Sequence, residues 1–381
     1  MAEPYREILV VELLGGLGDL VMLLPAVHAL ARRHPAAALR VLTHEPGGDL
    51  LRGDPAVTEV ITIGQGQSGA ERAAVVDALA LHRPDLAVTT TRYDGIPALL
   101  EDGAARAVTD LWRRPPPDQP VGERYLSILH AEGLIDAADV GARPRLHLRA
   151  DELDGGERMM ASWLPRESRR PPVLLVVDAG MDVKLWPRWH WQALVRLLRR
   201  DDYPVLAVGG PGGRPPPCPL LPRTDLRRLA AVFAAAGRRG GVVVGADTGP
   251  VRVAAAAGAR TVALFGPTDA RRYGLAGATP PPVDTARTGP GRIDTARTGP
   301  APAAGAPVDV QGRPDCPHRQ PTTISEQTCW WTADCPLSPA GPACMADIDP
   351  GTVAAAVRRA AGSDPAQAAS PSPVSHGTGR R

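Results

Sequence analysis

An alternation of short apolar runs with helical patterns, which occurs twice along the chain, restricts the possible folds more than any other feature. The first series has apolar runs at 8–11, 39–42, 60–63 and 85–89. The second series has them at 173–177, 204–208, 241–244 and 261–265. Strands that alternate with helices predict parallel sheets covered by helices on both faces. We therefore expect an α/β fold with two Rossmann-like, doubly wound domains that face a cleft.

A charged, proline-containing stretch at 151–171 separates the two series and is interpreted as a linker. This separation predicts an N-terminal domain over 1–165 and a C-terminal domain over 170–348.

Composition changes sharply near the end of the second series. Residues 275–315 are rich in Gly, Pro, Ala and Thr, and the heptapeptide DTARTGP occurs in them twice. Such a composition cannot bury a core, so a disordered insertion is predicted there. A C-terminal helix is expected over 349–361, followed by a disordered tail over 362–381.

Charge and the N-terminal sequence limit the partners and the location of the protein. The net charge is +2, which argues against a nucleic-acid partner held by bulk charge. No secretion signal is visible, and the first apolar stretch is interrupted by Glu12 and Asp19. A cytoplasmic location with at most peripheral membrane contact is therefore expected. The strong preference for arginine over lysine is typical of a GC-rich bacterial genome.

Three turns that follow predicted strands carry the candidate site residues. The first contains Gly18 and Asp19 at a helix start, where Asp19 is either an acid favoured by the helix dipole or a general base. The second contains Gly180 and Lys184, the only lysine of the chain. A lone lysine is commonly a solvated surface residue, but at a strand-end loop it can neutralise a phosphate.

The third turn follows the apolar run 241–244 and contains Asp247, Thr248 and Gly249. It presents a carboxylate, a hydroxyl and free backbone N–H groups at one point. Helix capping explains these residue types, with Pro250 as the first helical residue, and anion binding uses the same amides. Both interpretations stay open at this point.

Five cysteines are present, and four of them lie near the C-terminus with the spacing C-x12-C-x5-C-x8-C. The spacing contains no C-x2-C pair, so zinc binding is disfavoured and no metal is predicted. Burial or incidental oxidation is the expected explanation for them.

Taken together, these motifs resemble glycosyltransferase family 9, the bacterial heptosyltransferases, over residues 6–361 apart from the insertion. The resemblance rests on motifs that occur in the family's order: Leu17–Asp19 with Pro25, Leu51–Val57, Lys184 with Trp186 and Pro187, Asp247–Pro250, Ala263–Thr268 and Cys344–Met345.

The resemblance implies a GT-B fold and inverting transfer of a sugar from a nucleotide donor, usually ADP-heptose, to a hydroxyl acceptor. It implies that Asp19 is the base, that Lys184 contacts the donor phosphates and that Asp247, Thr248 and Gly249 bind donor sugar and phosphates. No tightly bound cofactor is implied. The acceptor could be a glycan, a lipid-linked glycan or a small natural product.

Three departures from the family pattern bear on the donor. Arg252 stands where the family usually has histidine, and an arginine there can still contact a phosphate. The stretch 209–217 lacks the glutamate expected for the nucleotide, and 178–183 lacks the usual Ser or Thr. Two alternatives therefore stay open: a GT-B sugar-nucleotide epimerase and a non-catalytic nucleotide-sugar-binding protein.

Overall fold

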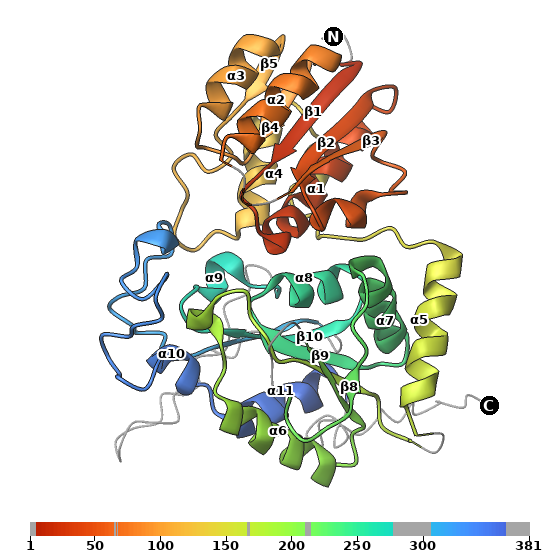
Figure 1. Cartoon of the computed structure of the whole chain (residues 1–381), viewed down its shortest axis with the longest axis vertical. Helices are drawn as coiled ribbons and strands as arrows, with labels where there is room; N and C mark the ends of the chain where they lie inside the picture. The colour runs from red at the N-terminus through yellow and green to blue at the C-terminus, as the bar shows by residue number, and fades with distance from the viewer. Residues whose placement is uncertain are drawn as a thin grey trace, which may run out of the picture.

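The computed structural model describes residues 5–64, 66, 68–165, 168–209, 215–276 and 306–362. It confirms the α/β class: within these residues two parallel sheets lie one above the other in Figure 1, each with helices on both faces. The predicted tail 362–381 beyond its first residue, most of the predicted insertion (277–305) and the stretch 210–214 lie outside the described residues.

The first sheet has the strand order β3-β2-β1-β4-β5, and all its strand pairs are parallel. Its strands are β1 (Glu7–Glu12), β2 (Ala38–His44), β3 (Glu59–Ile63), β4 (Leu86–Thr89) and β5 (Arg106–Val108). Its helices are α1 (Leu17–Arg33), η1 (Gly47–Leu51), α2 (Ala70–Leu81), α3 (Ile96–Gly103), α4 (Val121–Ala131) and η2 (Ala137–Asp139). Buried residues of α2 and α3 pack on one face and those of α1 and α4 on the other.

The second sheet has the order β11-β10-β9-β6-β7-β8 and is also parallel. Its strands are β6 (Val173–Val176), β7 (Val205–Val208), β8 (Leu220–Leu221), β9 (Val242–Ala246), β10 (Arg260–Phe265) and β11 (Val308–Gln311). Its helices are η3 (Asp182–Lys184), α6 (Arg188–Arg200), α7 (Leu226–Arg238), α8 (Gly249–Ala256), α9 (Ala270–Tyr273), η4 (Ile324–Glu326), α10 (Ala343–Ala346) and α11 (Pro350–Ala360). Helices α6 and α11 cover one face, and α7 and α8 cover the other.

The two halves meet through α1 and α8, which contact each other, and one hydrophobic cluster runs through both. In each sheet the strand order reverses direction at one point, between β1 and β4 in the first and between β6 and β9 in the second. Ligands of open α/β sheets bind at the carboxyl ends of the strands beside such a reversal. The loops that follow β1, β6 and β9 are therefore the places to look for a site.

Two predicted features need correction. Part of the predicted linker forms α5 (Ala150–Trp163), which packs along α7. The helix buries only Gly156 and Met160, so it has little apolar periodicity to recognise. A Cβ at Gly156 would lie 2.3 Å from the carbonyl oxygen of Ala231, which shows how closely the two helices approach.

The second correction concerns the predicted insertion 275–315. Its residues 308–311 form β11, which pairs with β10 as the edge strand of the second sheet. The four-residue run is too short to stand out in a Gly- and Pro-rich background. Within the described residues, no helix is both long enough and apolar enough to span a membrane.

Candidate functional site

The three predicted turns come together where the two halves meet. Asp19 lies in the first turn of α1, just after β1. Lys184 ends η3, after β6, and Asp247 directly follows β9. Because β6 and β9 are neighbours at the strand-order reversal, Lys184 and Asp247 are brought into contact although 63 residues separate them.

Asp247 is the centre of a buried ionic cluster. The Lys184 ammonium donates to its carbonyl oxygen at 3.0 Å and to its Oδ2 at 3.2 Å. Arg252 Nη2 donates to Oδ1 at 2.5 Å and to the Tyr273 carbonyl oxygen, also at 2.5 Å. The side chains of Asp247 and Arg252 are only 6% and 7% exposed. Two cations therefore surround one carboxylate, which leaves the cluster with a net positive charge.

The ionisation of Asp247 follows from these partners. Burial alone would raise the pKa of its carboxyl, but the charges of Arg252 and Lys184 and the bond from Arg252 outweigh burial and lower the pKa to about 2. Asp247 is therefore ionised throughout the neutral range, and it fixes both cations in place.

The N-terminus of α8 adds further anion-binding groups to this cluster. Thr248 is the N-cap of α8, and its side chain makes no capping bond. Its hydroxyl is buried and has no hydrogen-bond partner among the described residues. A buried hydroxyl without a partner is costly, and a bound ligand would satisfy it together with the free helix amides. Gly180, the fourth residue before Lys184, is exposed, and a Cβ there would meet nothing within 4 Å.

Glycines allow the two helix N-termini to touch. A Cβ at Gly249 would lie 2.7 Å from Leu17 Cβ, and a Cβ at Gly18 would lie 3.1 Å from Arg252 Cδ. Close packing between the halves therefore requires Gly249, whereas a Cβ at Gly18 would require Arg252 to shift slightly. This contact places the Asp19 turn directly opposite the Asp247 cluster.

The carboxylate of Asp19 lies against Gly16, at the start of its own helix. A Cβ at Gly16 would be 2.2 Å from Asp19 Oδ2, so only glycine leaves room for the carboxylate there. Burial raises the pKa of Asp19, the charges of Arg252 and Lys184 oppose that rise, and the charge of Asp247 adds to it. Asp19 is thus electrostatically coupled to all three charged residues of the cluster across the interface.

Two residues near the cluster have no signal in the sequence that marks them as part of a site. The Trp330 ring lies over Lys184, with its centroid 5.3 Å from the ammonium nitrogen. The Tyr273 carbonyl oxygen accepts from Arg252. Trp330 belongs to a largely irregular segment after β11, and nothing in its local sequence indicates that it reaches Lys184.

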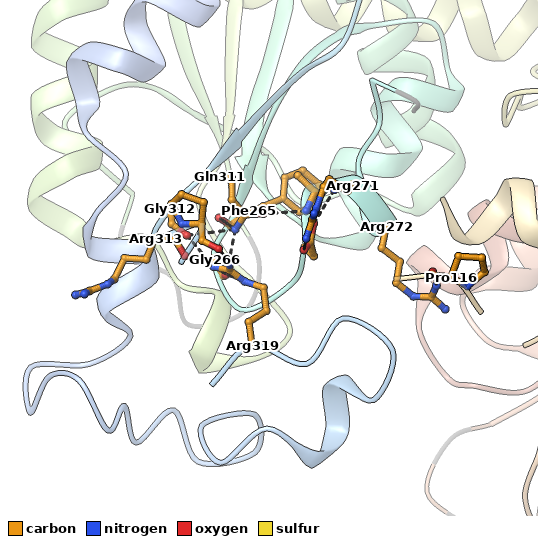
Figure 2. A network of polar contacts seen from close by, with 12 residues as sticks. Pro116, Phe265, Gly266, Arg271, Arg272, Gln311, Gly312, Arg313 and Arg319 are labelled. Atoms are coloured by element: carbon orange, nitrogen blue, oxygen red, sulfur yellow. Dashed lines mark hydrogen bonds and ion pairs between the residues drawn. The ribbon is translucent and has the colours of Figure 1, made fainter. Parts of the chain in front are cut away.

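Polar contacts fasten this C-terminal segment to the turn after β10 (Figure 2). Gln311 Nε2 donates to the carbonyl oxygen of Phe265 at 2.9 Å, and Arg319 Nη2 donates to that of Gly266 at 2.8 Å. In the same view Arg272 reaches the other half and donates to the Pro116 carbonyl oxygen at 2.9 Å. The turn that begins at Gly266 is thereby held from both sides.

The cysteines are all free thiols, and Cys329 and Cys344 are buried. Burial raises the pKa of Cys344 to about 12, so this thiol stays protonated. Among the described residues, no group of three or more His, Cys, Asp or Glu side chains could hold a metal ion.

Two Rossmann-like halves with charged strand-end loops facing each other form the arrangement of the GT-B fold. The model of glycosyltransferase family 9 (heptosyltransferase) matches residues 102–285, which cover the end of the first half and much of the second. Over that range the chain is similar to this family. No curated protein matches the sequence.

Solved structures show the same fold at low sequence identity. ADP-heptose LPS heptosyltransferase II of E. coli superposes with a TM-score of 0.60 at 18% identity, covering 92% of this chain and 96% of that one. A family 9 glycosyltransferase from Veillonella parvula gives a TM-score of 0.59 at 17% identity, with 72% and 85% covered. The E. coli heptosyltransferase WaaC with ADP-2-deoxy-2-fluoro heptose gives a TM-score of 0.50 at 17% identity, with 84% and 98% covered.

Proposed function

We propose that this glycosyltransferase transfers a heptose-like sugar from an ADP-linked donor to a hydroxyl acceptor with inversion at the anomeric carbon. The observation that carries the proposal is the placement of Lys184 and Arg252 around Asp247, opposite Asp19. An inverting displacement needs positive charge and amides on the leaving diphosphate and one base on the acceptor side.

The donor's diphosphate would bind where α8 begins. The Lys184 ammonium, the Thr248 hydroxyl and the first amides of α8 can all donate to phosphate oxygens there. Arg252 holds Asp247 and adds positive charge behind the phosphates. ADP is favoured as the nucleotide because the E. coli neighbours are described with ADP-heptose or an analogue of it.

Asp19 would remove the proton of the acceptor hydroxyl. The acceptor oxygen then attacks the anomeric carbon while the bond from that carbon to the diphosphate oxygen breaks. The negative charge left on the diphosphate is neutralised by Lys184. Because the pKa of Asp19 is raised, its carboxylate is a stronger base than an ordinary aspartate once ionised.

The test replaces Asp19 by Asn, which keeps the shape and removes the base. With ADP-heptose and a panel of glycosides as acceptors, we expect turnover measured by mass spectrometry to fall by about 10²- to 10⁴-fold. The dissociation constant of ADP, measured by calorimetry, should not rise, because the substitution removes a negative charge beside Lys184 and Arg252 and leaves the phosphate-binding groups in place. Asp102→Asn, an exposed aspartate of α3, is the matched control.

Three results would contradict this proposal. Unchanged turnover in Asp19→Asn removes the assigned base. Consumption of ADP-heptose without any acceptor favours an epimerase or a hydrolase. Tight ADP binding with no transfer to any acceptor favours a non-catalytic binding protein.

A further inference from the structure

The edge strand β11 places two polar side chains against α9. Its sequence VDVQ alternates apolar and polar residues, and successive side chains of a strand point to opposite faces of the sheet. Val308 and Val310 pack on the hydrophobic cluster that includes residues of α6 and α11. Asp309 and Gln311 bond instead to the start of α9 and to the residues after its end.

Gln311 holds the start of α9. Its Oε1 accepts from the Ala270 amide at 2.8 Å. Its Nε2 donates to the carbonyl oxygens of Phe265 at 2.9 Å and of Gly312 at 3.2 Å (Figure 2). Because the oxygen and the nitrogen of this side-chain amide are both used, its orientation is fixed. The start of α9 is thereby tied to the ends of β10 and β11.

Asp309 holds the chain after α9. Its Oδ1 accepts from the Leu275 amide at 3.2 Å, and its Oδ2 accepts from the Ala276 amide at 3.0 Å. A Cβ at Gly274 would lie 2.3 Å from Oδ2, so the backbone passes the carboxylate as closely as glycine allows. Arg143, from the segment that joins the two halves, donates to the carbonyl oxygens of Leu275 and Ala276 at 2.8 and 3.1 Å. The turn 274–276 is therefore held through both its amides and its carbonyl groups.

The Asp309 carboxyl is ionised when it makes these bonds. Burial raises its pKa to about 6, while the amides of Ala276 and Leu275 and then the charge of Arg252 oppose the rise, and the charge of Asp247 adds to it. At neutral pH most molecules therefore carry a carboxylate that accepts from both amides. The influence of Arg252 and Asp247 also shows that Asp309 lies within electrostatic reach of the donor-side cluster.

The turn that Asp309 holds also carries a ligand of Arg252. Tyr273 is the last residue of α9, and its carbonyl group directly precedes Gly274. The Tyr273 carbonyl oxygen accepts from Arg252 Nη2 at 2.5 Å, and the same Nη2 donates to Asp247 Oδ1. These two bonds fix the guanidinium. A shift of the turn 274–276 would move the Tyr273 carbonyl group and release Arg252 from one of its two partners.

We infer that Asp309 is a positioning residue of the donor site, which keeps Arg252 in place behind the donor diphosphate by holding the turn that carries the Tyr273 carbonyl group. The inference rests on the proposed function, because it takes the Asp247 cluster as the place where the diphosphate binds. Loss of the Asp309 carboxylate weakens donor binding through Arg252, although the bonds of Asp309 go to the backbone.

The test replaces Asp309 by Asn, which keeps the shape of the side chain but turns one of its two acceptors into a donor that faces a backbone N–H group. We expect the dissociation constant of ADP for the full chain, measured by calorimetry at neutral pH, to rise about three- to tenfold, because a hydrogen bond to a charged group is lost. Val310→Ala is the matched control, because Val310 packs on the other face of the same strand. It should leave the dissociation constant within about twofold of wild type.

Double-mutant cycles measure whether the effect passes through Arg252. Arg252→Lys keeps the charge and removes the planar fork, so in this background Asp309→Asn should raise the dissociation constant of ADP by less than about twofold. Thr248→Val removes a hydroxyl that has no hydrogen-bond partner among the described residues. In that background Asp309→Asn should keep its full effect, because Thr248 makes no side-chain bond to α9. A residue that only stabilised the fold would act equally in both backgrounds.

Gly274→Ala perturbs the same turn from the other side and replaces Asp309→Asn if that variant does not fold. Its Cβ pushes the backbone away from Asp309, so it should also raise the dissociation constant of ADP. Unchanged ADP affinity in the folded variant, equal weakening by Val310→Ala, or additive effects with Arg252→Lys would overturn the inference.

Failure of the proposed function gives a different result. If wild type does not bind ADP, the proposed function fails. The cycle between Asp309→Asn and Arg252→Lys is then followed by urea unfolding, which needs no ligand. A combined loss of stability smaller than the sum of the two separate losses supports the link between the two residues, and additive losses overturn it.

Discussion

Replacing Glu12 by Gln should make the stability of the protein less sensitive to pH between about 5 and 8. Glu12 is only 1% exposed, and its pKa rises from 4.5 to about 8 because of burial and then the charge of Asp19. The folded state therefore binds a proton that the unfolded state loses. This contribution to stability is fully present below pH 4.5 and is lost as the pH rises to about 8.

The size of the effect follows from the two pKa values. One pKa unit corresponds to about 1.4 kcal/mol, and the loss accumulates while the unfolded state is ionised and the folded state is not. Between pH 5 and pH 8 the wild-type protein should lose about 3 to 4 kcal/mol of unfolding free energy through Glu12 alone. Glutamine keeps the shape of the protonated side chain and does not titrate, so Glu12→Gln lacks this loss.

Urea unfolding followed by tryptophan fluorescence at pH 5 and pH 8 measures the difference. We expect Glu12→Gln to gain stability relative to wild type as the pH rises, whereas Glu59→Gln should follow wild type. A difference between Glu12→Gln and wild type that is the same at both pH values, within about 0.5 kcal/mol, would refute the assignment of a buried, protonated Glu12.

Two other predictions test the interface and the donor site. Gly249→Ala places a Cβ 2.7 Å from Leu17 Cβ, so it should destabilise the protein by about 1–3 kcal/mol and weaken ADP binding. Gly141→Ala is the control, because a Cβ there meets nothing within 4 Å, and it should have neither effect. Equal melting temperatures of the two variants would contradict the close contact. Lys184→Met keeps the approximate length of the side chain and removes its charge, so the dissociation constant of ADP, measured by calorimetry, should rise about tenfold or more. Unchanged affinity would exclude Lys184 from the phosphate site. Asp247→Asn provides a second perturbation of the same cluster.

The sequence predicts the parts of the site whose position depends on the strand that directly precedes them. Asp19, Lys184 and Asp247 each follow a strand that an apolar run predicts, and parallel strands bring their carboxyl ends to one edge. The structure places these residues together as expected. Their chemical roles stay predictions.

The remaining parts of the site depend on contacts between residues that are distant in sequence. Trp330 reaches Lys184 from 146 residues further along the chain, through a segment with little regular structure. In the sequence Glu12 stands out only as an interruption of an apolar run, because its burial depends on contacts with Leu14 and Thr43. The sequence predicts that Arg252 contacts a phosphate. Its ion pair with Asp247 depends on the way in which α8 packs after β9.

The order of the strands and helices along the chain determines when each part of the molecule can form during synthesis. All five strands of the first sheet have been made by Val108, and α4 is complete at Ala131. The second sheet needs β11, and its core includes residues of α11, which ends at Ala360. At about 5–20 residues per second the ribosome needs roughly 10 to 50 s to travel from the end of α4 to the end of α11. During that interval all strands of the first sheet are already made, and Lys184, once made, lacks the ring of Trp330 until the ribosome has added 146 more residues.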